Sequence, residues 1–226
     1  IAECLVGSEM CIRDRHRIPE KINQNVNNGN ADINLDFTMR ELEESIRQLE
    51  EGKLTGEDQI ENTMIKQLPP ISRKYLMDLL NKMWNEGTFP QEWKTSIILP
   101  ILKTGKEQTD LKNYRPISLT SCICKLYERM LNNRLMWFLE KTKQLSPRQY
   151  GFRQNKTTID PIGALTTDIL NGFKDKKITT AVFFDFEKAF DTIRRQTILS
   201  NLMNMGVHGQ MLQFIHNYLK DQSIKV

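Results

Sequence analysis

Residues 179–184 (TTAVFF) constrain the fold of this chain more than any other segment. β-Branched and aromatic side chains fill the segment, so it predicts a buried strand, whose backbone needs a neighbouring strand to pair with. Asp185 follows directly, and a carboxylate at the end of a strand can bind a hard divalent cation, which prefers oxygen ligands. Capping of the following helix is the alternative role for Asp185, and the spacing alone favours it.

Most other apolar residues recur at helical spacing. Thr38 and Glu41 have the spacing of a capping box, which predicts that a helix begins beside them. Predicted helices cover residues 39–51, 60–68, 76–84, 126–139, 158–173, 189–193, 196–205 and 210–220. Extended segments are predicted at 96–102, 115–119, 179–184 and 224–226. Because helices predominate and the strands are not adjacent in sequence, we assign the chain to the α+β class.

The first 37 residues differ from the rest of the chain in composition. Residues 5–15 (LVGSEMCIRDR) resemble the in-frame translation of a sequencing-library adapter, so we expect residues 1–15 to be an artefact. An ordinary exposed tail is the alternative. Residues 16–37 are rich in Asn, which is typical of a linker. The folded domain is therefore expected at residues 38–226.

The overall composition excludes several classes of protein. With 226 residues, 39% of them hydrophobic, the chain can bury a core and is not of a disordered type. The net charge of +4 permits a nucleic-acid partner without requiring one. The sequence contains no apolar run of about 18 residues, so we expect no membrane partner. Cys122 and Cys124 have no second ligand pair nearby and are predicted to be packed thiols.

The segment around Asp185 resembles a known family. Residues 181–193 (AVFFDFEKAFDTI) are similar to motif A of the reverse transcriptases encoded by non-LTR (LINE-type, jockey-like) retrotransposons. Five further blocks resemble the same family and occur in the family's order. They are residues 53–60 (KLTGEDQI), 89–94 (FPQEWK), 100–103 (PILK), 113–119 (NYRPISL) and 149–153 (QYGFR) followed by Thr157 and Thr158. Together they identify residues 38–226 as part of a reverse transcriptase domain.

The resemblance implies an RNA-directed DNA polymerase with a right-hand fold, of which this chain would hold the fingers and the first part of the palm. Asp185 would be the first catalytic, metal-binding aspartate. Two Mg²⁺ ions in the complete enzyme would clamp the attacking 3′-hydroxyl and the triphosphate. The backbone at Phe186 would lie against the second metal and the phosphates. Phe190 would be the steric gate that excludes a ribose 2′-hydroxyl; without the motif, it would be interpreted as a core aromatic residue.

Further residues gain expected roles from the resemblance. Lys103 and Arg115 would bind the incoming deoxynucleoside triphosphate, because Arg offers a bidentate fork to phosphate and Lys a compact charge. Gly151, Phe152 and Arg153 would contact the template strand. The implied partners are an RNA template, a DNA primer and deoxynucleoside triphosphates. The implied location is intracellular, in the cytoplasm and nucleus, and no pattern indicates an oligomeric state.

The sequence also departs from the family. Gln59 stands where the family usually has Gly, so we expect the loop at residues 53–60 to take another conformation. No Ala-Asp-Asp motif, which supplies the remaining catalytic aspartates, occurs in the sequence. We therefore expect these 226 residues to be a fragment that does not polymerise alone. We also expect the strand at 179–184 to lack a pairing partner and to invite aggregation.

Two other functions are kept open. The chain could be a non-catalytic nucleic-acid-binding remnant of a decayed element, and the DNA sequence beyond the codon for Val226 would distinguish this from a polymerase. Alternatively, it could be a helical interaction domain that carries the motifs by chance. The presence of Arg115, Asp185 and Phe190 in the family's order argues against the interaction domain.

Overall fold

The structure, a computed structural model, describes residues 31–186 and 192–225. Contacts within the chain divide it into two compact units. The first unit comprises residues 31–134 and 192–225, and the second comprises residues 135–186. Helix α6 (Cys122–Lys141) begins in the first unit and ends in the second.

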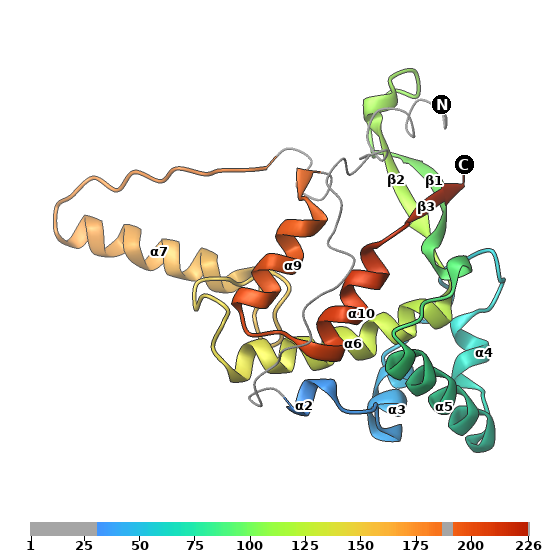
Figure 1. Ribbon diagram of the computed structural model, residues 1–226. Coiled ribbons are helices and arrows are strands. Elements are labelled where there is room, and N and C mark those ends of the chain that lie inside the picture. Colours follow the sequence, from blue (N-terminus) through green and yellow to red (C-terminus); the bar gives the residue numbers. More distant parts are fainter. Residues whose placement is uncertain (1–30, 187–191, 226) are drawn as a thin grey trace. The chain divides into compact units, whose positions relative to one another are not determined.

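Helices form most of the first unit (Figure 1). The capping box is confirmed, because Thr38 Oγ1 accepts a hydrogen bond from the Glu41 backbone at 3.3 Å and Thr38 N donates to the Glu41 carboxylate at 2.8 Å. Gly87 ends a long helix in the left-handed conformation, with φ of 63°. The helices are α2 (Ala31–Asn34), α3 (Met39–Arg47), α4 (Asn62–Lys66), α5 (Pro70–Glu86), α9 (Arg195–Asn204) and α10 (Gly209–Leu219).

A three-stranded sheet completes the first unit (Figure 1). The 3-10 helix η1 (Gln91–Lys94) leads into β1 (Thr95–Leu102), and η2 (Leu111–Asn113) leads into β2 (Tyr114–Leu119). β1 pairs antiparallel with β2 and parallel with β3 (Ser223–Lys225), in the order β2-β1-β3. The strands predicted at 96–102, 115–119 and 224–226 are therefore confirmed as far as the structure describes them.

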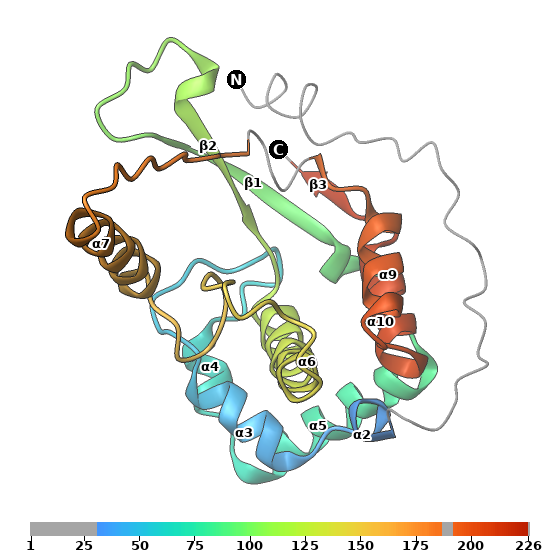
Figure 2. The ribbon, with the colours of Figure 1, turned by 90° about the vertical axis from the view of Figure 1, so that its left-hand side faces the viewer.

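The core of the first unit is an aromatic cluster contributed by α5, α6 and α10. The ring centroids of Trp84 and Phe214 lie 5.6 Å apart, and those of Tyr127 and Phe214 lie 5.0 Å apart. All three side chains are buried, and the Tyr127 hydroxyl donates to the Leu80 carbonyl at 3.0 Å. Contacts between aromatic rings add to the free energy of burial, so this cluster stabilises the packing of the three helices. Figure 2 shows α3, α4 and α5 next to one another.

The described end of the predicted linker packs into this core. Ile33 lies in α2, and both Ile33 and Phe37 are buried. The linker prediction for residues 16–37 is therefore wrong at 31–37. The polar composition of the segment gave no sign that Ile33 and Phe37, two of its apolar residues, would be buried. Residues 16–30 lie outside the described part of the chain.

Arg134 holds this segment against α6. Its guanidinium donates to the carbonyls of Leu35 and Asp36 and forms two hydrogen bonds of 2.9 and 2.8 Å with the Glu41 carboxylate. The guanidinium also lies 3.9 Å from the centroid of the Phe37 ring. Because both the charge and the donors of Arg134 are satisfied, its burial is tolerated.

The loop between α3 and α4 packs closely against the start of α6. A Cβ atom added to Gly56 would lie 2.7 Å from the backbone nitrogen of Ser121 and 2.7 Å from the carbonyl carbon of Thr120. Glycine is therefore required there by the close approach of the backbone. Gln59 takes a left-handed conformation, with φ of 53°, which glycine adopts at no steric cost.

The second unit has few buried side chains. It contains the last residues of α6 and the whole of α7 (Ile159–Lys174). α7 agrees with the helix predicted at 158–173. None of the residues of α7 is buried, and Ile159, Ile162 and Phe173 are exposed. Within the described residues of either unit, no helix is both long and apolar enough to span a membrane.

The strand predicted at 179–184 is absent. These residues form neither strand nor helix, and Phe183 and Phe184 expose 82% and 88% of their surface. The prediction was wrong because a strand is stable only when a neighbouring strand supplies hydrogen-bond partners, and no described strand pairs with this segment. The helix predicted at 189–193 lies mostly outside the described residues.

Candidate functional site

One face of the β1–β2 hairpin combines apolar and basic side chains. In the antiparallel register Leu99 opposes Ile117, and Ile101 opposes Arg115. Directly opposed residues, and residues two apart on one strand, point to the same face of a sheet. These four side chains therefore form one strip, and all four are exposed. A strip of this kind is available to a ligand that has both apolar and anionic parts.

Lys103 follows directly after β1, two residues beyond Ile101. Its Nζ donates to the Lys112 carbonyl at 2.6 Å, and its backbone nitrogen donates to the Asn113 carbonyl at 2.7 Å. The Asn113 side chain in turn donates to the Glu107 carbonyl at 2.9 Å. The loop between β1 and β2 is therefore held by side-chain to backbone hydrogen bonds, with Lys103 at its base.

Arg115 differs from Lys103 in having a free side chain. Its guanidinium makes no hydrogen bond or ion pair with any residue that the structure describes, and it is exposed. A free guanidinium offers two parallel donors to a carboxylate or a phosphate. Arg115 is therefore the cation of the hairpin that is best placed to bind an anion.

Asp185 lies in the exposed segment after α7. Its Oδ1 accepts a hydrogen bond from the backbone nitrogen of Phe186 at 2.9 Å. Around Asp185 and elsewhere in the described residues, no three His, Cys, Asp or Glu side chains gather as a metal site. A single carboxylate fits a Mg²⁺ ion that takes its other ligands from water and substrate phosphates, but not an ion held by protein alone. Phe190 lies outside the described residues.

Arg153 is fully engaged within the second unit. It forms two hydrogen bonds of 2.7 Å with the Glu140 carboxylate and donates to the carbonyls of Ser146 at 2.7 Å and Gln149 at 3.2 Å. The hydrogen bond with Glu140 raises the pKa of Arg153 and lowers the pKa of Glu140. Glu140 could not be predicted from the sequence as the partner of Arg153, because a partner 13 positions away leaves no local pattern. Contact between Arg153 and a template phosphate would require this pair to open.

Gly151 and Phe152 form the tip of the turn that Arg153 holds. Phe152 has a φ of 59°, which is rare for a bulky residue, and 92% of its surface is exposed. The position that a Cβ atom of Gly151 would occupy has open space around it. Strained and exposed residues of this kind cluster at binding sites, so the tip is a candidate contact surface.

The predicted site residues divide between the two units. The first unit contains Lys103 and Arg115, which the hairpin brings onto neighbouring strand ends. The second unit contains Gly151, Phe152, Arg153, Asp185 and Phe186.

Comparison with protein families gives one match. Residues 101–226, more than half of the chain, match the family described as reverse transcriptase (RNA-dependent DNA polymerase). The matched residues include Lys103, Arg115 and Asp185, together with β2 and the last two residues of β1.

Several relatives are retrotransposon proteins. The probable RNA-directed DNA polymerase from transposon BS of Drosophila melanogaster is 34% identical over 188 residues, which are 83% of this chain and 21% of the relative. The RNA-directed DNA polymerase from mobile element jockey of the same species is 30% identical over 84% of this chain and 20% of the relative. The probable RNA-directed DNA polymerase from transposon X-element, also of this species, is 31% identical over 70% of this chain and 17% of the relative. The chain spans about a fifth of the length of the first two relatives.

Proposed function

The chain belongs to the reverse transcriptase family, and on this premise we propose that it forms the fingers and the first part of the palm of an RNA-directed DNA polymerase of a non-LTR retrotransposon. The observation that carries the proposal is the β1–β2 hairpin, where Lys103 and Arg115 lie beside an exposed apolar strip. The proposed partners are an RNA template, a DNA primer and deoxynucleoside triphosphates.

The hairpin face complements a nucleoside triphosphate. Its apolar side chains match the base, and its cations match the negatively charged phosphates. Leu99 and Ile117 offer apolar surface to a base. The free guanidinium of Arg115 binds phosphate oxygens through two donors. Lys103 Nζ donates one hydrogen bond to the Lys112 carbonyl, and its two other donors are available to the phosphates. The ordered loop positions Lys103 before the nucleotide arrives, which lowers the entropy cost of binding.

Asp185 is the proposed ligand of Mg²⁺. When bound, this ion stabilises the charge that develops during phosphoryl transfer. The hydrogen bond from Phe186 N orients the Asp185 carboxylate and leaves its second oxygen for the ion. Asp185 would supply one oxygen ligand to the ion, and water and substrate phosphates would supply the others. Phe190, as the proposed steric gate, selects deoxynucleotides.

The turn at Gly151 and Phe152 is the proposed contact with the template. The exposed Phe152 ring offers a platform on which a base stacks, and the absence of a side chain at Gly151 lets the strand approach the backbone. Arg153 contributes by holding the turn through Glu140 rather than by binding a phosphate directly.

A chimeric polymerase tests this proposal. Residues 38–226 replace the matching segment of the jockey polymerase, and extension of a DNA primer on an RNA template is measured with Mg²⁺. We expect Asp185→Ala to abolish extension, and Asp168→Ala, which removes an exposed carboxylate of α7, to preserve it. Arg115→Ala should raise the KM for deoxynucleotides about tenfold, because a charge-assisted hydrogen bond is lost. Lys106→Ala, in the loop between β1 and β2, should leave the KM unchanged.

The same assay distinguishes the proposed polymerase from the alternative, a non-catalytic nucleic-acid-binding remnant. A chimera that binds the primer and template but does not extend the primer, while the parent polymerase is active, would indicate a non-catalytic nucleic-acid-binding remnant. Extension that survives Asp185→Ala would overturn the proposed role of Asp185.

A further inference from the structure

A short stretch of the second unit contains the whole net positive charge of the chain. Residues 137–156 include five Lys and Arg residues and one Glu, so their net charge is +4. The net charge of the whole chain is also +4, so the remaining residues are neutral in sum. The five cations are Lys141, Lys143, Arg148, Arg153 and Lys156, and all except Arg153 are exposed. A local excess of exposed cations attracts a polyanion, which the small charge of the whole chain does not reveal.

Two of these cations lie over aromatic rings. Lys141 Nζ lies 4.4 Å from the centroid of the Trp137 ring, and Lys156 Nζ lies 5.5 Å from the centroid of the Tyr150 ring. Both lysines are exposed, and 48% of the Trp137 surface is exposed as well. A nucleotide presents a planar base and a charged phosphate. An exposed ring with an ammonium group beside it therefore offers one group to each part of a nucleotide.

The cation–aromatic pairs of the first unit cannot act in this way. Arg134 lies over the Phe37 ring, and Lys94 Nζ lies 6.0 Å from the centroid of the Phe89 ring. Arg134 and Lys94 are 9% and 8% exposed, so a ligand in solution cannot reach them without unpacking the core. Similar contacts therefore stabilise the fold in the first unit and are accessible to a ligand in the second.

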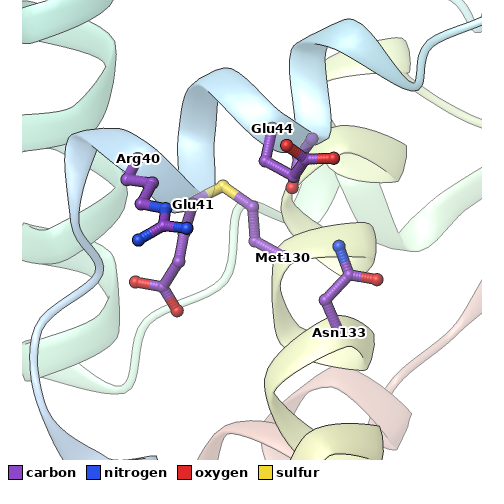
Figure 3. Close-up of a pocket in the computed structure, with 6 residues that line it drawn as sticks. Arg40, Glu41, Glu44, Met130 and Asn133 are labelled. Atoms are coloured by element: carbon purple, nitrogen blue, oxygen red, sulfur yellow. The ribbon is translucent and has the colours of Figure 1, made fainter.

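The pocket between α3 and α6 in the first unit does not offer such a surface either (Figure 3). None of the described residues that line this pocket is aromatic. Its two carboxylates, Glu41 and Glu44, already pair with Arg134 and Arg47. A nucleic acid would find no ring there on which a base could stack.

Trp137 lies beside the turn that we propose as the template contact. Trp137, Glu140 and Lys141 occupy positions i, i+3 and i+4 of α6, so they share one face of the helix. Glu140 forms two hydrogen bonds of 2.7 Å with Arg153, and Arg153 directly follows the exposed Phe152. The Glu140–Arg153 pair therefore connects the two exposed rings within the second unit.

We propose that Trp137 and Lys141 form a stacking platform for an unpaired base of the template strand, next to the contact at Phe152. The indole stacks on the base, and the Lys141 ammonium binds a neighbouring phosphate. Stacking of this kind tolerates any sequence, because every base has a planar face. Bases within a duplex are covered by their neighbours, so the platform selects single-stranded RNA. The inference rests on the proposed function for its choice of the template as the partner, and it adds two residues of α6 to that contact.

Binding of the full 226-residue chain to two single strands of equal length and charge tests the stacking contact. One strand is an unstructured RNA of mixed sequence, and the other has the same sugar-phosphate backbone without bases. We expect Trp137→Leu to weaken binding to the RNA about tenfold and to leave binding to the abasic strand unchanged, as measured by fluorescence anisotropy. The matched control is Tyr75→Leu, because Tyr75 is an aromatic residue of α5 in the first unit that is 70% exposed.

The salt dependence of binding tests the phosphate contact separately. We expect Lys141→Gln to make the slope of log K against log salt concentration shallower by about 0.7 on both strands, because one phosphate contact is lost. Lys141→Arg should restore the slope. Lys74→Gln, which removes an exposed cation of α5, should leave the slope unchanged. An unchanged slope in Lys141→Gln would overturn the role of Lys141.

Three further results decide the inference. Equal losses on both strands in Trp137→Leu, or no loss on the RNA, would overturn it. Thermal unfolding of Trp137→Leu should match that of the wild type, because the ring is half exposed, and this would show that the fold is intact. Polyglutamate that competes as well as the RNA would assign the surface to an acidic protein and overturn the choice of nucleic acid.

The chimeric polymerase separates this inference from the proposed function. If Trp137→Leu binds the RNA as tightly as the wild type while the chimera still extends the primer, this inference alone fails. If the chimera is inactive while Trp137→Leu loses binding only to the strand with bases, the platform is supported and the proposed catalysis fails.

Discussion

The two units of the chain contain similar sequence patterns but differ in what those patterns bury. In the first unit the apolar residues of α5, α6 and α10 meet around Trp84. Among the described residues of the second unit, Phe138 and Leu139 are buried, and the apolar residues of α7 and of 178–186 are largely exposed. The pattern of an amphipathic helix or of a β-type segment therefore indicates which side chains need to be buried. Whether they are buried depends on the elements that pack against the segment.

The same contrast separates two ion pairs of identical chemistry. Arg134 and Arg153 each form two hydrogen bonds with one glutamate. Side-chain exposure is similar in the two pairs: Arg134 and Glu41 are 8% and 32% exposed, and Arg153 and Glu140 are 11% and 41% exposed. Arg134 differs in lying against the Phe37 ring, so equal hydrogen-bond geometry does not mean equal stabilisation.

The largest expected effect on stability appears when a buried aromatic residue, Trp84, is compared with an exposed one, Phe184. Trp84→Ala should lower the free energy of unfolding by about 3–5 kcal/mol, because it leaves a cavity in the core. Phe184→Ala should change it by less than about 0.5 kcal/mol, because the ring is exposed. Urea unfolding followed by far-UV circular dichroism measures both. Similar losses for the two variants would show that the second unit has a core of its own.

The next effect compares the two arginines. Arg134→Met should cost about 3 kcal/mol, because it leaves the partly buried Glu41 carboxylate without its partner. Arg153→Met should cost much less in the same urea titration. Lys82→Met, which removes an exposed pair with Glu86, is the control for loss of a surface charge. An Arg153 variant as unstable as the Arg134 variant would contradict the contrast between the units.

The two glutamates, Glu41 and Glu140, should also differ in how strongly they make the stability of the protein depend on pH. Hydrogen bonds from Arg134 and the Thr38 backbone lower the pKa of Glu41 below 4.5 despite the opposing effect of burial. A carboxylate with a lowered pKa in the folded state stabilises the protein above its ordinary pKa and loses this contribution as the pH falls through the lowered value. We therefore expect Tm to fall between about pH 5 and 3, and to fall less steeply in Glu41→Gln. Glu140→Gln, in the second unit, should also make the fall less steep, but by a smaller amount, because the Glu140 carboxylate is more exposed and water screens its pair with Arg153.

The smallest effect concerns two residues with positive φ. Gln59→Gly should raise the free energy of unfolding by about 0.5 kcal/mol, because relief of left-handed strain exceeds the added entropy of the unfolded chain. Phe152→Gly, in the second unit, relieves the same kind of strain but should weaken binding to a primed template. Thermal unfolding and fluorescence anisotropy separate the two outcomes. A Gln59→Gly variant that is less stable would mean that the Gln59 side chain contributes to the loop.

Local sequence patterns predicted the parts of the structure that depend on local physics. The capping box at Thr38 is one example, because its donor and acceptor lie three residues apart. The helix predicted to end near residue 84 is another, since α5 ends at Glu86 and Gly87 then takes the left-handed conformation that glycine adopts freely. Ile33 and Phe37 were missed, because their burial depends on Arg134 and Trp84, which lie far along the chain.

The sequence by itself determined the family of this chain, the order of its helices and the identity of its candidate site residues. Side-chain chemistry and short-range spacing are sufficient for these. The tertiary structure alone decided that residues 179–186 are exposed, that Arg153 is held by Glu140, and that α3 and α6 enclose a pocket. Burial, ion pairing and cavities arise between residues distant in sequence, and only the folded arrangement brings such residues together.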